Sequence, residues 1–349
     1  MRRALLELLV DPITREPLRL APNAGGPALD CGLLIARDGA TYPIREGIPR
    51  FVATEDEGQL QTRDAFAYKW QQRDSYDSPG MIAGYISWLA EKYGFGTRDK
   101  WIDYFTSRGR ILDVGCGSGI PAFSIVDSET WVGDTLWVGA DISAAVDVAR
   151  ERIGHYPNTH FVQADALQLP FRDGSFDTVF SEGVLHHTPS TRQAILAVAR
   201  ILALGGEFLF YVYRQKGPVR EFTDDAIRAS IAPLSDAEAW ESMRSLTRLG
   251  QALAELQTVV DVPEDVPLLG IKAGQWDVQR LIYWHFAKLF WNSAWTFEEN
   301  VHVNFDWYRP RYAHRQTADE VRRWCDEAGL AITWFHEQES GYTVRAIRA

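Results

Sequence analysis

The sequence predicts an α/β protein with a doubly wound parallel sheet, a small β-rich N-terminal module and a large, mainly helical insertion. Residues 110–119 form an apolar strand pattern that runs directly into three glycines at alternate positions. Strand and helix patterns then alternate through residues 101–213, which is typical of parallel sheets with helices on both faces. With 349 residues, of which 46% are hydrophobic, the chain can bury a large core and exceeds one average domain.

The N-terminal part of the chain is expected to contain two segments of different character. Residues 1–54 predict a small module of short strands. Within it, residues 33–42 predict a β-hairpin with Asp38 and Gly39 at the turn, a pair favoured in tight turns. Residues 55–100 show a helical, aromatic pattern, and we expect this segment to lie over a bound ligand.

The core, residues 101–213, is expected to hold five parallel strands. The helix at residues 189–203 places its apolar side chains on one face, at a spacing of three and four residues. The expected strands are residues 110–115, 135–141, 159–164, 176–181 and 206–213.

The chain leaves the core pattern over residues 214–313 and returns to it over residues 314–349. The insertion is rich in aromatic residues. After it, Thr317 and Glu320 fit a capping box at a helix start, and Gly329 fits its end. Two closing strands are expected at residues 331–336 and 342–347.

The glycine turn indicates a ligand at the carboxyl end of the first core strand. Gly115, Gly117 and Gly119 allow a sharp turn and a close approach of the backbone to a ligand. A dinucleotide fingerprint requires a further glycine where this chain has Ile120, so the spacing disfavours a nicotinamide cofactor. An acidic residue, Asp141, closes the next strand.

The run D-V-G-C-G-S-G from Asp113, followed by Asp141, resembles the class I S-adenosylmethionine-dependent methyltransferases. Residues 175–189, with His186 and His187, resemble the small-molecule members of that family, including those of ubiquinone and menaquinone biosynthesis. The resemblance implies a Rossmann-like, seven-stranded methyltransferase sheet that ends in an antiparallel hairpin. It also implies S-adenosyl-L-methionine as the cofactor.

By this resemblance, several side chains would contact the cofactor. Asp141 would accept both ribose hydroxyls, and Asp165 would accept the adenine amino group. For either aspartate taken alone, a helix cap is the favoured interpretation, and the prediction of cofactor contact rests on their shared register after successive strands. The implied cofactor residues are Asp113, Gly115, Cys116, Gly117, Gly119, Asp141, Ile142, Asp165, Ala166, Ser181 and Trp70.

His186 and His187 are the candidate catalytic residues. Imidazole titrates near neutrality, so either side chain could accept a proton from a hydroxyl or amine during methyl transfer. The alternative is that both histidines shape the cofactor pocket.

The candidate substrate residues follow the fifth strand and end the insertion. Residues 303–314 bring an acid, a phenol, guanidinium groups and an imidazole together. For Arg214 and Glu221, which follow the fifth strand, the alternative to substrate contact is an ion network within the loop. Aromatic residues at helical spacing, such as Tyr283 and Phe290, predict packed core. The substrate candidates are Tyr213, Arg214, Glu221, Asp306, Tyr308 and His314.

Residues 8–18 and 42–49 look like the small zinc-ribbon-like module that activates, or is fused to, some methyltransferases. Residues 11–14 read Asp-Pro-Ile-Thr where that family commonly carries Cys-Pro-x-Cys. Cys31 alone cannot supply the four ligands of a structural zinc. We therefore expect a module without metal, held by packing.

Composition limits the partners. The net charge of −11 disfavours nucleic acid, which is bound largely through lysine and arginine. No apolar run is long enough to span a membrane, and three cysteines suggest no disulfide framework, so a cytoplasmic protein is expected.

The leading function is methyl transfer to oxygen or nitrogen of a small-molecule metabolite. The alternatives are an RNA methyltransferase and a cofactor-binding regulator without turnover, and the oligomeric state stays open.

Overall fold

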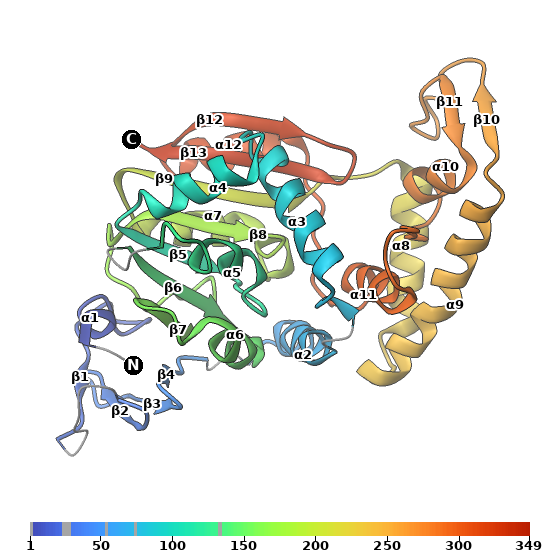
Figure 1. Ribbon diagram of the computed structural model, residues 1–349. Coiled ribbons are helices and arrows are strands. Elements are labelled where there is room, and N and C mark those ends of the chain that lie inside the picture. Colours follow the sequence, from blue (N-terminus) through green and yellow to red (C-terminus); the bar gives the residue numbers. More distant parts are fainter. Residues whose placement is uncertain (1–2, 23–28, 53–54, 73–74, 132–134) are drawn as a thin grey trace.

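The computed structural model describes residues 3–22, 29–52, 55–72, 75–131 and 135–349, and its centre is a seven-stranded mixed sheet (Figure 1). The strand order is β12-β13-β9-β8-β5-β6-β7. The predicted Rossmann-like methyltransferase sheet is therefore confirmed. Its strands are β5 (Arg110–Val114), β6 (Leu136–Asp141), β7 (Thr159–Gln163), β8 (Phe176–Glu182), β9 (Leu202–Tyr213), β12 (Leu330–Glu337) and β13 (Gly341–Arg348).

The strands alternate their side chains between two apolar layers, as a pleated sheet covered on both faces requires. In β5, Ile111 packs in one layer and Leu112 in the other, and Leu209 and Phe210 of β9 divide in the same way. The first layer contains α4 (Arg98–Thr106), α5 (Ile120–Val126) and α6 (Ala145–Ile153). The second contains α7 (Thr191–Ile201) and α12 (Ala318–Glu327), and α12 begins with the predicted capping box.

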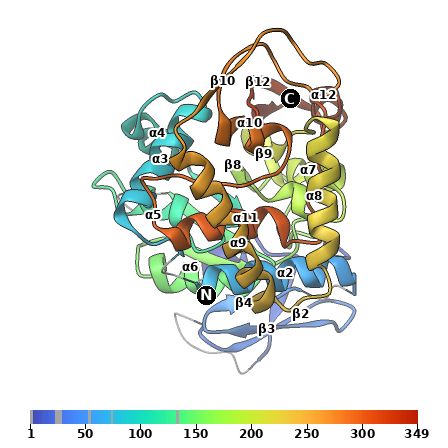
Figure 2. The same cartoon turned by 90° about the vertical axis from the view of Figure 1, so that its right-hand side faces the viewer.

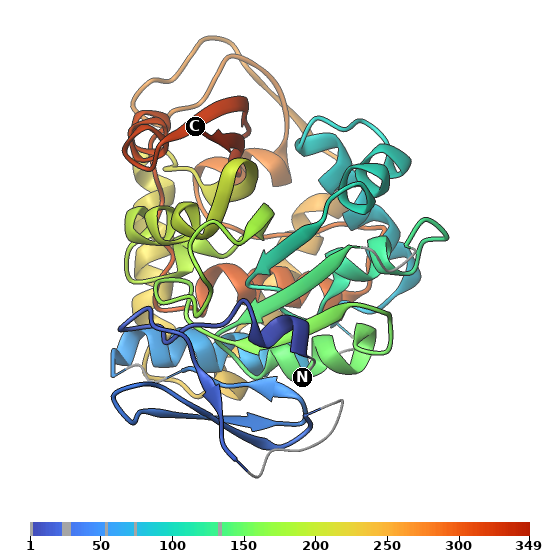
Figure 3. The ribbon, with the colours of Figure 1, turned by 90° about the vertical axis from the view of Figure 1, so that its left-hand side faces the viewer.

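The N-terminal module lies against the second layer and shares its core (Figure 3). Leu5 and Leu9 belong to the same apolar cluster as Phe171 of the core, and the Arg15 guanidinium donates to the carbonyl of Leu169. The predicted hairpin forms between β2 and β3. The module comprises α1 (Arg3–Leu6), β1 (Arg19–Leu20), β2 (Gly32–Ile35), β3 (Thr41–Arg45) and β4 (Ile48–Pro49).

The insertion covers the side of the sheet at which the parallel strands end (Figure 2). An aromatic cluster joins it to β9, because Tyr211 and Tyr213 pack with Trp240, Phe305 and Trp307. Between the N-terminal module and β5 lie α2 (Glu57–Gln71) and α3 (Pro79–Lys92). The insertion contains α8 (Pro218–Ile231), α9 (Asp236–Glu255), β10 (Val259–Val262), β11 (Gly274–Asp277), α10 (Val278–His285) and α11 (Phe297–Tyr308).

Three further features bear on function. Across the described ranges, none of the helices combines the length and apolarity needed to cross a membrane. Within the same ranges, no group of three or more histidine, cysteine or acidic side chains is arranged to hold a metal ion. Cys116 and Cys325 are buried free thiols, whereas Cys31 is an exposed one.

Candidate active site

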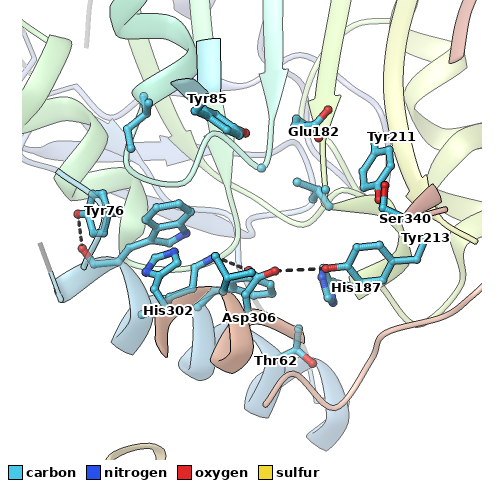
Figure 4. A pocket seen from close by; sticks show the side chains of 18 of the residues that line it. Thr62, Tyr76, Tyr85, Glu182, His187, Tyr211, Tyr213, His302, Asp306 and Ser340 are labelled. Atoms are coloured by element: carbon cyan, nitrogen blue, oxygen red, sulfur yellow. Dashed lines mark hydrogen bonds and ion pairs between the residues drawn. The ribbon is translucent and has the colours of Figure 1, made fainter. Parts of the chain in front are cut away.

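A cavity of about 930 Å³ lies where the carboxyl ends of the parallel strands meet α2, α3 and the insertion (Figure 4). This volume is near the upper end of the range for small-molecule sites. Side chains of α2 and α3 line it, and whether residues 55–100 lie over a bound cofactor stays a prediction. The cavity therefore joins the predicted cofactor region to the predicted substrate region.

The glycine turn forms one wall, and its close contacts explain why glycine is required there. Gly115 has a φ of 75°, and a Cβ at this position would lie 2.2 Å from the Val184 side chain. A Cβ on Gly117 would lie 2.9 Å from the Trp70 indole. Gly115 and Trp70 line the cavity, whereas Gly117 and Gly119 support the turn from behind.

Asp141 lies at the carboxyl end of β6, with its carboxylate on the cavity wall. Its Oδ2 accepts from the Gly117 amide at 2.9 Å, and Oδ1 accepts from the Ser143 amide and hydroxyl at 2.8 and 2.7 Å. Burial raises the pKa of this carboxyl, although these three donors oppose the increase. A carboxylate has about four lone-pair positions, so acceptor capacity remains for a ligand.

Asp165 follows β7 and lines the same cavity beside Ala166 and Ile142. Its Oδ1 accepts from the Leu167 amide at 2.9 Å. Burial raises the pKa of Asp165, while hydrogen bonds from Leu167 and Gln59 lower it. The structure thus brings both predicted carboxylates, with apolar surface between them, to one wall.

Besides Gly117 and Gly119, three further predicted cofactor residues do not line the cavity. Ser181 donates its hydroxyl to the Val114 carbonyl at 3.0 Å, which ties β8 to β5. Cys116 is buried, close to Gly139. Asp113 is buried, and its Oδ2 makes no hydrogen bond within the described residues. Burial raises the pKa of Asp113, and the charge of Asp141 raises it further. Strand alternation turns Asp113 and Ser181 away from the cavity, which their neighbours Val114 and Glu182 line.

The two histidines occupy different environments. His187 lines the cavity, and its Nδ1 lies 2.6 Å from the Tyr312 carbonyl oxygen. Because that oxygen only accepts, Nδ1 carries the proton and Nε2 keeps a free lone pair. Burial lowers the pKa of His187 to about 4, so the ring is neutral at physiological pH. His186 is stacked on Tyr213 at 3.6 Å between ring centroids and does not line the cavity, so its position does not support the predicted proton transfer.

A buried ion pair lines the cavity, and Figure 4 shows its acidic member, Asp306, beside Tyr213. The Lys69 ammonium of α2 lies 2.5 Å from Asp306 Oδ1 of α11, and the Tyr213 hydroxyl donates to Asp306 Oδ2 at 3.2 Å. Burial alone would raise the pKa of Asp306, but the Lys69 ammonium above all outweighs it and holds the pKa well below its ordinary value. Asp306 and Tyr213 are thus at the site that the sequence predicted.

The other four substrate candidates lie outside the cavity lining, which corrects their assignment. Arg214 pairs with Glu337 at 3.2 Å, and Glu221 pairs with Arg315 at 2.6 Å. These ion pairs agree with the alternative that both side chains belong to a loop ion network. The amide of His314 donates to the His186 carbonyl. The Tyr308 hydroxyl donates to a buried aspartate of α8, Asp224. Arg214 and Glu221 thus pair with residues of the core, and Tyr308 joins two helices of the insertion.

The sequence analysis missed Glu182, which lines the cavity as the last residue of β8. Its carboxylate accepts from the Lys92 ammonium and, at 2.7 Å, from the Tyr93 hydroxyl. Burial lowers the pKa of Lys92 to about 8, although Glu182 opposes this change. The position of Glu182 at a strand end was the available signal. Tyr283 is buried as the core prediction requires, and both Tyr283 and Phe290 also line the cavity.

Known proteins match the central part of the chain. Residues 112–210 match the family described as a methyltransferase domain. The chain is 34% identical over 116 residues to the probable tRNA methyltransferase 9B of Bos taurus, covering 32% of this chain and 23% of that protein. It is 37% identical over 101 residues to the 27-O-demethylrifamycin SV methyltransferase of Amycolatopsis mediterranei, covering 28% of this chain and 36% of that protein.

The fold is also similar to that in a solved structure of magnesium protoporphyrin IX methyltransferase from Synechocystis PCC 6803 with bound SAH. The alignment covers 84% of this chain and 100% of that chain. The identity is 14% and the TM-score is 0.42. The alignments to the two curated relatives span 23% and 36% of those proteins.

Proposed function

We propose that this chain, whose residues 112–210 are a methyltransferase domain, transfers the methyl group of S-adenosylmethionine to oxygen or nitrogen of a small molecule. One observation carries the proposal. The strand-end carboxylates Asp141 and Asp165 line a single cavity with the insertion residues Tyr283 and Asp306. A cofactor held at the strand ends would therefore share one enclosed space with its methyl acceptor.

The residues on the cofactor side fit S-adenosylmethionine. Asp141 offers acceptor capacity for a ribose diol, and Asp165 offers an acceptor beside the apolar side chains of Ile142 and Ala166. At Gly115 a Cβ would collide with the Val184 side chain, so the turn that forms this wall requires a glycine. When bound, the cofactor supplies a methyl group activated by a sulfonium.

The residues on the acceptor side exclude water and can receive a proton. The aromatic side chains of Tyr283, Trp284 and Phe290 line this part of the cavity. Alignment of the two reactants and exclusion of water are the main requirements of methyl transfer. The free Nε2 of His187 can accept the proton of a hydroxyl or amine as the methyl group arrives.

An RNA substrate is the second candidate, because a probable tRNA methyltransferase is among the similar proteins. Two observations favour a small molecule instead. The net charge is −11, and the insertion places the bulky side chains of Trp284, Phe290 and Trp295 in the cavity lining. A regulator without turnover would bind the cofactor but transfer no methyl group.

The experiment that separates these functions uses S-adenosylmethionine labelled in its methyl group. The protein is incubated with total tRNA, with a cell extract of small metabolites, or with buffer. The proposal expects label in the small-metabolite fraction and none in tRNA. Label confined to tRNA supports the RNA function, and cofactor binding without transfer to any fraction supports the regulator.

Replacing His187 by alanine is expected to slow turnover roughly 100-fold, because general-base help is typically worth 10²–10⁴. Affinity for S-adenosylmethionine should change little, since Nε2 makes no hydrogen bond within the described residues. Turnover is followed by release of S-adenosylhomocysteine, and affinity by calorimetry. Because the pKa of His187 is about 4, the rate should not fall between neutrality and about pH 5. An unchanged rate in the variant would exclude base catalysis at this position.

A further inference from the structure

Lys288, between α10 and α11, is a buried cation that lines the cavity and lacks an anionic partner. The residue as a whole is only 7% exposed. The ammonium lies 4.6 Å from the centroid of the Trp307 ring. Within the described residues, this ammonium makes neither a hydrogen bond nor an ion pair. A buried charge of this kind is costly unless a partner compensates it.

The carboxylates nearest to Lys288 are already engaged. Asp306 is held by Lys69 and by the Tyr213 hydroxyl. Asp224 is held by the Arg220 guanidinium at 2.8 Å, and it also accepts from the Trp307 indole at 2.8 Å. Neither carboxylate therefore pairs with Lys288.

A second cation near the same tryptophan, Arg228, increases the excess of positive charge. The Arg228 guanidinium lies 5.5 Å from the Trp307 ring centroid, and Arg220 lies 5.4 Å from it. Arg228 donates to the Pro310 carbonyl, and its Nε and Nη2 have no hydrogen-bond partner within the described ranges. Unlike Arg220, Arg228 forms no ion pair there. The local field therefore favours an anion at this end of the cavity.

We infer that the methyl acceptor is an organic acid, an otherwise apolar molecule whose anionic group pairs with the Lys288 ammonium. This inference rests on the proposed function and names the substrate class for the same cavity. The aromatic side chains of Tyr283, Trp284 and Phe290 line the cavity and would contact the apolar part of the acid. The incoming anion supplies the partner that the folded chain does not provide.

The charge on Lys288 depends on pH in the physiological range. Burial lowers the pKa of Lys288 to about 7. The positive charges of Arg220 and Arg228 on α8 lower this pKa further, whereas the negative charges of Asp306 and Asp224 raise it. The ammonium is fully present below this pKa, so an anion should bind most tightly there. Affinity should then fall as the pH rises through about 7, since the cation is lost.

Mutation of Lys288 distinguishes its titration from that of the other titratable groups at this end of the cavity. Burial lowers the pKa of Lys216, whose ammonium lies 5.8 Å from the Trp307 ring and donates to the Ser340 carbonyl. His187 is neutral over the tested range, because its pKa is about 4. A pH dependence that disappears when Lys288 is replaced therefore belongs to Lys288.

The test uses two fluorescent probes of similar shape on the full chain saturated with S-adenosylhomocysteine, which keeps the probes out of the cofactor site. Anilinonaphthalene sulfonate carries an anionic group, and phenylnaphthylamine lacks it. Lys288→Met is compared with wild type, with the charge-preserving Lys288→Arg, and with Lys272→Met, which removes an exposed lysine that is 80% accessible.

The inference expects Lys288→Met to weaken binding of the sulfonate roughly 10- to 100-fold at about pH 6, the equivalent of one charge-assisted hydrogen bond. Binding of the neutral probe should stay unchanged. Lys288→Arg should retain most of the affinity for the sulfonate, and Lys272→Met all of it. That affinity should decline from about pH 6 to about pH 9 in wild type and in Lys272→Met, which both keep Lys288, but not in Lys288→Met or Lys288→Arg.

Equal sulfonate affinity in Lys288→Met and wild type would overturn the inference, as would a parallel loss for both probes. Lys288→Gln serves as the second uncharged variant if the methionine variant does not fold, and an unchanged affinity for S-adenosylhomocysteine shows that a variant is folded. Failure of the wild-type chain to bind S-adenosylhomocysteine would instead count against the proposed function. The two failures are therefore distinguishable.

Discussion

Replacing Asp141 by alanine is expected to weaken S-adenosylmethionine binding roughly 100-fold, or about 3 kcal/mol, as loss of charged hydrogen bonds predicts. The carboxylate lines the cavity and is the only side chain that the Gly117 amide contacts within the described residues. Its removal would take away both the ribose acceptor and a support of the glycine turn. Isothermal titration calorimetry measures the change directly.

Two further variants separate ligand contact from support of the turn. Asp141→Asn retains an oxygen that can accept from the Gly117 amide but loses the charge, so it should still bind the cofactor at least 10-fold more weakly than wild type. Asp103→Ala removes an exposed aspartate of α4 and should leave affinity unchanged. Wild-type affinity in both Asp141 variants would disprove the ribose assignment.

Replacing Asp224 by alanine is expected to lower the free energy of unfolding by about 3–5 kcal/mol, the usual cost of breaking one side of a buried ion pair. Asp224 and Arg220 are each 1% exposed in their side chains. Asp224 also accepts from the Trp307 indole and the Tyr308 hydroxyl, so one carboxylate holds α8 to α11. Urea denaturation followed by circular dichroism gives the change in stability.

The neighbouring residue provides a matched control. Asp225 pairs with Arg315 at 2.7 Å, but its side chain is 61% exposed. Asp225→Ala should therefore cost less than about 1 kcal/mol, as for other exposed pairs. Equal effects of the two substitutions would show that the buried pair does not stabilise the insertion. Replacing both Arg220 and Asp224 by apolar residues should restore much of the lost stability, since no unpaired charge remains.

The sequence predicted most of the fold because the relevant signals are local. Strand alternation, the glycine turn and the capping box of Thr317 and Glu320 each depend on a few neighbouring residues, and all three appear in the structure. Tight approaches such as that of Gly115 to Val184 explain why glycine occurs there. The insertion was recognisable only as mainly helical, because its topology depends on contacts with distant elements.

The site was predicted unevenly for a related reason. Asp141 and Asp165 line the cavity because residues at the ends of parallel strands share one edge of the sheet. Ser181 also lies in a core strand, but its hydroxyl is used between strands. In the loops and the insertion, residue type alone did not distinguish Asp306, which lines the cavity, from Glu221, which pairs with Arg315.

The sequence by itself thus determined the layered α/β core, its glycine turn and the two carboxylates on the cofactor side. Only the tertiary structure decided which charges are paired. Lys69 and Asp306 lie 237 positions apart and meet across α2 and α11, while Lys288 is left facing the cavity without a carboxylate. Local patterns reflect short-range backbone preferences, whereas pairing of buried charges depends on where the packed insertion places distant side chains.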